Sequence, residues 1–261
     1  MASIPDISQQ QLGNALRAGQ FSLVYQPKIV VATEAFCGVE ALARWRHPEW
    51  GAVSPAIFIP LIEASDLIHP FTDWVIDAAT ADWAAWERQG LTTTVAINVS
   101  AHNLARTDLP DIVEAHCRRR AMPCRYLTVE LTETATENAI ALLDTLSRFR
   151  IKEIGVSLDD FGTGHSSEAR FDQLPFSEVK IDRSFVFDAD INASKRDAIA
   201  AIVEMAGAFD IRVVAEGVET HAALATVGQL GCEIAQGYHI AKPMPADRLP
   251  AWAAGRPSTV C

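Results

Sequence analysis

The sequence predicts an α/β fold, a (β/α)8 barrel in which the first strand runs antiparallel to the second. Seven short apolar runs each end in a residue that can bind a metal ion or a phosphate, and after the second run they alternate with helix-like segments. Only residues 32–35 separate the first two runs, which is too short for a parallel crossover. The length of 261 residues suits one barrel of the TIM type.

The expected elements follow one another along the whole chain. A short helix at 8–19, which Ser8 can cap, comes first. The expected strands are 21–31, 36–45, 94–99, 126–131, 155–158, 178–181, 211–215 and 232–235. Residues 46–55 are expected to be a loop, and amphipathic helices are expected at 57–68, 70–90, 111–120, 137–149, 195–209 and 220–230. We therefore expect a barrel at 21–250, a helical lead-in at 1–20 and a tail at 251–261.

The residues that end the apolar runs are mostly oxygen ligands. They are Glu40, Asn98, Glu130, Asp159, Asp160, Lys180, Glu216 and Gln236. The active site of such a barrel lies at the C-terminal ends of its strands, so these residues are expected on one face. A buried carboxylate is costly unless a cation or hydrogen-bond donors compensate it. Because none of these residues is His or Cys, the set favours Mg²⁺ or Mn²⁺ over zinc, and its size suits two ions.

Asp159 and Asp160 are adjacent, and adjacent residues on a strand face opposite sides. Both can reach the barrel mouth only if the strand has already ended at Asp159. The turn expected at Gly162 and Gly164 favours that interpretation. The alternative is an ordinary surface turn.

Charge and cysteine content limit the binding partners and the cellular compartment that we expect for this protein. The net charge of −11 argues against duplex nucleic acid or an anionic membrane as the main partner. The first residues lack the pattern of a secretory signal, and no apolar run is long enough to cross a bilayer, so we expect a cytoplasmic protein. Five cysteines without a CxxC pair argue against a disulfide framework and a structural zinc, and Cys37 and Cys232 are expected to be buried as small apolar residues.

An ordered set of motifs resembles the EAL family, bacterial phosphodiesterases that are specific for cyclic-di-GMP. The motifs are EAL at 40–42, RWRHP at 44–48, NVS at 98–100, ELTE at 130–133, DDFGTG at 159–164, KIDRSFV at 180–186, VAEGVE at 214–219 and QGY at 236–238. Each motif alone is modest, but the complete ordered set is highly specific. The resemblance extends from about residue 21 to about residue 249.

The resemblance implies a metal site with two ions, Mg²⁺ or Mn²⁺. The first ion would be held by Glu40, Asn98, Glu130 and Asp159. Asp159, Asp160 and Glu216 would hold or orient the second ion and its waters. In this arrangement Asp159 serves both ions.

Further residues receive roles from the resemblance alone. Lys180 would contact the nucleophilic water or the scissile phosphate, and Gln26 and Arg44 would bind the phosphate or guanine of the substrate. Glu219 would complete the metal and water shell together with Gln236, which would also face the substrate. Glu133 would steady the DDFGTG loop.

These roles imply hydrolysis of cyclic-di-GMP to linear pGpG, with a water between two cations attacking the phosphorus in line. Two alternatives are a non-catalytic cyclic-di-GMP receptor that acts through a protein partner and a barrel enzyme for another phosphodiester. Lys180 could instead be an ordinary snorkelling lysine, and Arg44 could pair with Glu49 at the surface. Residues 165–170 depart from the usual family sequence where members tend to dimerise, so a homodimer through this region is a further expectation.

Overall fold

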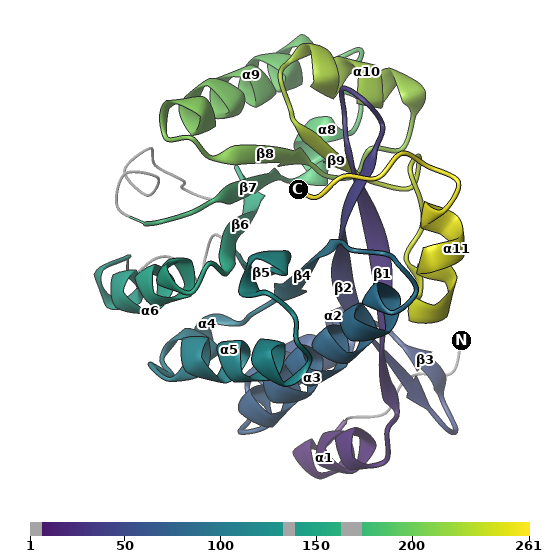
Figure 1. The fold of residues 1–261 in the computed structure, drawn as a ribbon, viewed down its shortest axis with the longest axis vertical. Coiled ribbons are helices and arrows are strands. Elements are labelled where there is room, and N and C mark those ends of the chain that lie inside the picture. The colour runs from purple at the N-terminus through teal and green to yellow at the C-terminus, as the bar shows by residue number, and fades with distance from the viewer. Residues whose placement is uncertain (1–6, 133–138, 163–173) are drawn as a thin grey trace.

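The computed structural model describes residues 7–132, 139–162 and 174–261, and eight of its strands form a closed ring (Figure 1). In ring order these are β1 (Phe21–Val30), β9 (Ile234–Gln236), β8 (Arg212–Ala215), β7 (Glu178–Ile181), β6 (Gly155–Phe161), β5 (Leu127–Thr132), β4 (Thr94–Asn98) and β2 (Phe36–His47). β1 pairs antiparallel with both β2 and β9, and the other neighbours in the ring are parallel. The predicted (β/α)8 barrel with a reversed first strand is confirmed.

Helices cover the outside of the ring (Figure 1). The longer ones are α2 (Pro55–Glu63), α3 (Ile68–Glu87), α5 (Leu109–Arg119), α6 (Ala139–Ile151), α9 (Ala193–Ala208) and α10 (His221–Gln229). α1 (Gln9–Arg17), which precedes the first strand, is as long as α2 and α10. Shorter elements are α4 (Ala101–Leu104), η1 (Cys124–Tyr126), α8 (Arg183–Val186), β10 (Met244–Pro245), η3 (Ala246–Arg248) and α11 (Leu249–Ala253). Ser8 caps α1 through a reciprocal pair of hydrogen bonds with Gln11, as the sequence predicted for this helix start.

The main apolar core lies between the strands and the helices, whereas the inside of the barrel holds buried charged residues and a small separate apolar cluster of Cys37, Val214 and Ile234. On β5, Leu127, Val129 and Leu131 are fully buried and belong to the main apolar cluster. Glu130, on the opposite face of the same strand, contacts two lysines inside the ring. The alternation along β5 therefore separates a packed outer face from a charged inner face.

Residues 46–55 differ from the expected loop. β2 continues to His47 and pairs with β3 (Gly51–Val53), with Trp45 opposite Val53. Trp45 is buried and stacks against Phe21, so aromatic packing extends the strand beyond its expected end. α2 then begins at Pro55, directly after Ser54, where proline is favoured as the first helical residue.

The C-terminal segment lies beside the start of β2 and corrects the cysteine prediction. Cys37, at the start of β2, forms a disulfide with Cys261, so the expectation that Cys37 is only a small apolar residue was wrong. Backbone hydrogen bonds join Phe36 to Pro257 and Thr259, and Figure 1 shows the C-terminal end within the ring of strands. The partners are 224 residues apart in sequence, and only barrel closure brings them together. No helix among the described residues is long and apolar enough to span a bilayer.

Candidate metal centre at the barrel rim

Lys180 lies at the centre of the predicted site. Its strand, β7, projects the side chain into the barrel, where it is 1% exposed. The ammonium nitrogen lies 2.6 Å from Glu216 Oε1, 3.0 Å from Glu130 Oε2, 3.1 Å from Asp159 Oδ1 and 3.5 Å from Glu40 Oε2. These acids come from four different parts of the ring: β2, β5, β6 and the end of β8. A snorkelling lysine would reach water, so this contact set rejects that alternative.

The carboxylates around Lys180 share too little positive charge. Burial raises the pKa of Glu40, Asp159 and Glu216, and repulsion between the carboxylates adds to the rise, although Lys180 opposes it. Burial also acts on Glu130, but two ammonium groups outweigh it and hold its pKa at about 2. In turn, the surrounding acids raise the pKa of Lys180 despite its burial. Lys180 is therefore charged, and the remaining negative charge is available to a cation.

Amide side chains orient Glu40. Asn98 donates a hydrogen bond to Glu40 Oε1 at 2.9 Å, and Gln236 donates to Glu40 Oε2 at 2.7 Å. Gln26, opposite Glu40 in the β1–β2 ladder, accepts from Gln236 at 3.2 Å. The other amide atom of Gln236, Oε1, is buried and has no hydrogen-bond partner among the residues that the structure describes. A buried acceptor without a partner indicates room for a donor or a cation beside it.

Asp160 reaches the site by a route that the sequence did not predict. The strand does not end at Asp159, because β6 continues to Phe161. Its register with β7 shifts between Leu158 and Phe161, and Asp160 adopts a left-handed backbone conformation with φ of 55°. Aspartate tolerates this conformation better than most residues. The bulge removes the strict alternation, so both aspartates can contribute to one site.

Two overlapping carboxylate groups can hold metal ions. Glu40, Glu130 and Asp159 form one, and Asp159, Asp160 and Glu216 form the other, with the ligand oxygens of each group within 4.8 Å of one another. Five carboxylates thus face the ammonium groups of Lys180 and Lys28, which leaves negative charge in excess. Hard oxygen donors of this kind fit Mg²⁺ or Mn²⁺. The donor set, the excess charge and the unpartnered Gln236 oxygen therefore fit divalent cations.

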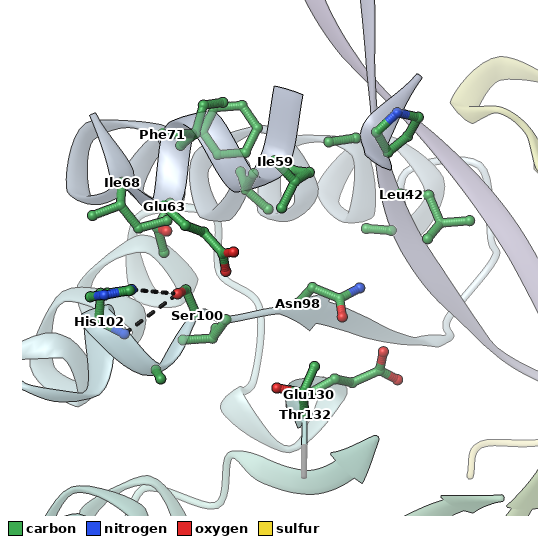
Figure 2. Close-up of a pocket in the computed structure, with 18 of the residues that line it drawn as sticks. Leu42, Ile59, Glu63, Ile68, Phe71, Asn98, Ser100, His102, Glu130 and Thr132 are labelled. Atoms are coloured by element: carbon green, nitrogen blue, oxygen red, sulfur yellow. Dashed lines mark hydrogen bonds between the residues drawn. The ribbon is translucent and has the colours of Figure 1, made fainter. Parts of the chain in front are cut away.

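Two cavities meet at this rim. The smaller one, about 270 Å³, is lined by Glu40, Asp159, Glu216, Lys180, Gln26, Gln236 and the exposed Glu219. The larger one, about 630 Å³, lies between β2, α2, α3 and β4 and is mainly apolar. In Figure 2, Asn98 and Glu130 border this larger cavity, while Ile59, Phe71 and the Glu63 carboxylate approach it from the helices. An apolar space therefore adjoins the charged rim.

The remaining predicted residues have different outcomes. Arg44 lines the larger cavity, and no ion pair of the described residues joins it to Glu49. Burial lowers the pKa of Arg44, opposed by Tyr238 and Glu40. Glu133 and residues 165–170 lie outside the described residues, so their predicted roles in loop support and dimerisation stay predictions.

Sequence reasoning missed a second buried lysine, Lys28. Its ammonium nitrogen lies 2.8 Å from Glu130 Oε1 and 3.4 Å from Glu178 Oε1, and Ser157 donates to that Glu178 oxygen at 3.0 Å. A signal was present, because Lys28 interrupts an apolar run two residues after Gln26 and Glu178 stands two residues before Lys180. A spacing of two places both members of each pair on one strand face.

The fold and the rim together define an α/β-barrel protein with an acidic site that can hold divalent cations. The family model described as "EAL domain" matches residues 9–243, and the chain belongs to that family. Two relatives from Pseudomonas aeruginosa are each 38% identical to it. The bifunctional diguanylate cyclase/cyclic di-GMP phosphodiesterase MucR matches over 91% of this chain and 35% of its own length. The cyclic di-GMP phosphodiesterase PA2567 matches over 89% of this chain and 40% of its own length.

Solved structures agree with this assignment. The PaMucR phosphodiesterase in complex with c-di-GMP is 37% identical, with a TM-score of 0.87, covering 92% of this chain and 98% of that one. The EAL enzyme Bd1971 bound to cAMP and cyclic-di-GMP is 31% identical, with a TM-score of 0.88. The match covers 94% of this chain and 67% of the Bd1971 chain. The chain spans only 35% and 40% of the two curated relatives named above.

Proposed function

We propose that this chain hydrolyses cyclic-di-GMP to linear pGpG with the help of two divalent cations, Mg²⁺ or Mn²⁺. The observation that carries the proposal is the pair of carboxylate groups that share Asp159 around Lys180. Relatives whose names include cyclic di-GMP phosphodiesterase, at 38% identity, support the choice of substrate. In this proposal the protein acts in the cytoplasm and lowers the level of a second messenger.

The cations would be held by the residues that the sequence predicted. Glu40, Asn98, Glu130 and Asp159 would hold one, and Asp159, Asp160 and Glu216 the other. Bound cations of this type supply positive charge to phosphoryl oxygens and increase the acidity of a bound water. Gln236 and Asn98 keep both oxygens of Glu40 oriented, so this ligand needs little rearrangement.

The reaction forms a bond from a water oxygen to phosphorus and breaks the bond from phosphorus to the 3′ oxygen. The attacking water loses a proton, and the departing 3′ oxygen gains one. Lys180 stays protonated because of its acidic neighbours, so it stabilises the extra negative charge of the transition state as a hydrogen-bond donor. Glu219, exposed at the edge of the smaller cavity, can orient water there.

Substrate binding would use the two cavities together. A purine base fits the apolar space beside Ile59 and Phe71, where the Glu63 carboxylate can accept hydrogen bonds from a guanine edge. Arg44, on the wall of the same cavity, can bind a phosphate or a base. Gln26 can contact the substrate from β1.

The proposal is tested by incubating the purified chain with cyclic-di-GMP and separating the nucleotides chromatographically. Reactions contain Mg²⁺, Mn²⁺ or an excess of chelator. We expect pGpG with either metal and intact substrate with the chelator. Asp159→Asn, which keeps the size of the side chain but removes a shared ligand, is the matched inactive variant.

Intact substrate with both metals, in a sample shown to be folded by circular dichroism, would contradict the proposal. If the same sample binds cyclic-di-GMP tightly in calorimetry, the receptor function replaces hydrolysis. A panel of other cyclic and linear phosphodiesters tests the second alternative, because a barrel enzyme for another substrate would cleave one of those instead.

A further inference from the structure

A buried chain of charges runs from the interior of the barrel to the rim. It begins at Ser157, which donates to Glu178, and continues through Lys28 to Glu130 and then to Lys180. Lys28 lies on β1 and reaches across the ring to acids on β5 and β7. Its side chain is 5% exposed, so water offers it little compensation.

The two oxygens of Glu130 face different partners. Oε1 accepts from Lys28 at 2.8 Å, and Oε2 accepts from Lys180 at 3.0 Å. Only Oε2 therefore faces the group of ligands that surrounds Lys180. A carboxylate held in this way has one oxygen available to an ion at the rim and cannot turn both toward it without leaving Lys28.

We propose that Lys28 is a positioning residue, which holds Glu130 Oε1 inside the barrel so that Glu130 offers a divalent cation at the rim one oxygen. This inference rests on the cation site of the proposed function. Stability alone gives Lys28 little reason to be present, because apolar residues of similar volume often replace a buried ion pair without loss. Residues that orient metal ligands commonly change metal affinity by roughly 10–100-fold when they are replaced.

Lys28 is itself held in place. Glu178 lies 3.4 Å from its ammonium group, and the Ser157 hydroxyl fixes the Glu178 oxygen concerned. Gln236, which orients Glu40, is the β9 residue paired with Lys28 in the ladder. Lys28 on β1 and Gln236 on β9 are therefore neighbours, and they contact two different proposed metal ligands, Glu130 and Glu40.

The test measures Mn²⁺ affinity by electron paramagnetic resonance of the free ion, without substrate, on the full chain. Lys28→Met is expected to weaken binding by roughly 10–100-fold. Lys28→Arg, which keeps the charge, should recover most of the affinity. Lys152→Met is the matched control, since it removes a lysine that pairs with Asp111 and Glu114 between the end of α6 and the start of β6, at the end of the strands opposite the rim, and it should leave affinity unchanged.

A double variant distinguishes positioning from general stabilisation of the barrel. If Lys28 acts through Glu130, Lys28→Met combined with Glu130→Gln should bind Mn²⁺ as weakly as Glu130→Gln alone. Losses that multiply in the double variant, or Lys28→Met affinity within twofold of the unchanged chain, would overturn the inference. Should Lys28→Met fail to fold, Glu178→Gln carries the test, because it loosens the support of Lys28 and should weaken binding several-fold; unchanged affinity there would also overturn it.

Failure of the inference differs from failure of the proposed function. A chain whose Mn²⁺ affinity depends on Lys28 acting through Glu130, as described, but which leaves cyclic-di-GMP intact contradicts only the hydrolysis. A chain that cleaves cyclic-di-GMP while Lys28→Met binds Mn²⁺ normally contradicts only the role of Lys28.

Discussion

The ammonium group of Lys180 lies 2.6 Å from Glu216 Oε1, the shortest of its four carboxylate contacts. Lys180→Met should lower the free energy of unfolding of the metal-free chain by about 3 kcal/mol, because it leaves buried carboxylates without their counter-charge. Chemical denaturation in the presence of a chelator measures this. Lys195→Met, a surface lysine with an acidic partner, should change it by less than about 1 kcal/mol.

The same variant should also change how stability depends on pH. The pKa of Glu216 is already raised, and loss of Lys180 raises it further, so the folded form holds protons that the unfolded form releases. Stability then falls as the pH rises from the unfolded pKa of about 4.5 through the folded pKa. Denaturation curves for Lys180→Met between pH 5 and about 8 should show this decline; equal stability across that range would contradict it.

Removal of divalent cations should lower thermal stability. Ligands that bind only the folded state stabilise it by about 2.7 kcal/mol at a hundred times their dissociation constant. We therefore expect the melting temperature to rise with Mn²⁺ and to return to its starting value with a chelator. Asp159→Asn removes the ligand that both carboxylate groups share, and its melting temperature should respond little to Mn²⁺.

Glu40→Gln tests the orientation of a single ligand. Asn98 and Gln236 both donate to the Glu40 carboxylate, so an amide at this position would direct its NH₂ at one of these donors. Hydrolysis of cyclic-di-GMP should fall about a hundredfold or more. The exposed Glu233→Gln serves as control, and comparable activity in the two variants would argue against a ligand role for Glu40.

At Gly237, beside the rim, the backbone of Val218 lies too close to leave room for a side chain. A Cβ atom there would lie 2.1 Å from the carbonyl oxygen of Val218, which forms part of the loop after β8. Gly237→Ala should therefore separate Gln236 from this loop and reduce both stability and activity. Gly207→Ala, within α9, meets nothing within 4 Å and should be neutral or slightly stabilising in the same thermal and activity assays.

The disulfide and the buried thiols predict a pattern of alkylation. Burial raises the pKa of Cys117 and of Cys232 to about 12, so at pH 8 roughly one thiol in ten thousand is ionised. Iodoacetamide should label both slowly in the folded chain and rapidly in denaturant. Peptide mapping without reductant should recover Cys37 joined to Cys261. Recovery of both as alkylated thiols from unreduced protein would contradict the bond.

The sequence by itself determined the barrel, its reversed first strand and the residues at the strand ends. Apolar periodicity fixes which segments are strands, and a four-residue connection forces β1 and β2 to be antiparallel. Glu40, Glu130 and Asp159 could be predicted as neighbours because parallel strands end at the same edge of a barrel. These are local or topological properties of the chain.

Only the tertiary structure decided how the charges are shared. The contact of Lys28 with Glu130 crosses the ring between strands about a hundred residues apart, and the bulge at Asp160 depends on a register shift against β7. The bond between Cys37 and Cys261 likewise requires barrel closure. Strand periodicity predicts the face on which a side chain lies, but the partner that it meets across a closed barrel depends on strand register and on the shape of the interior.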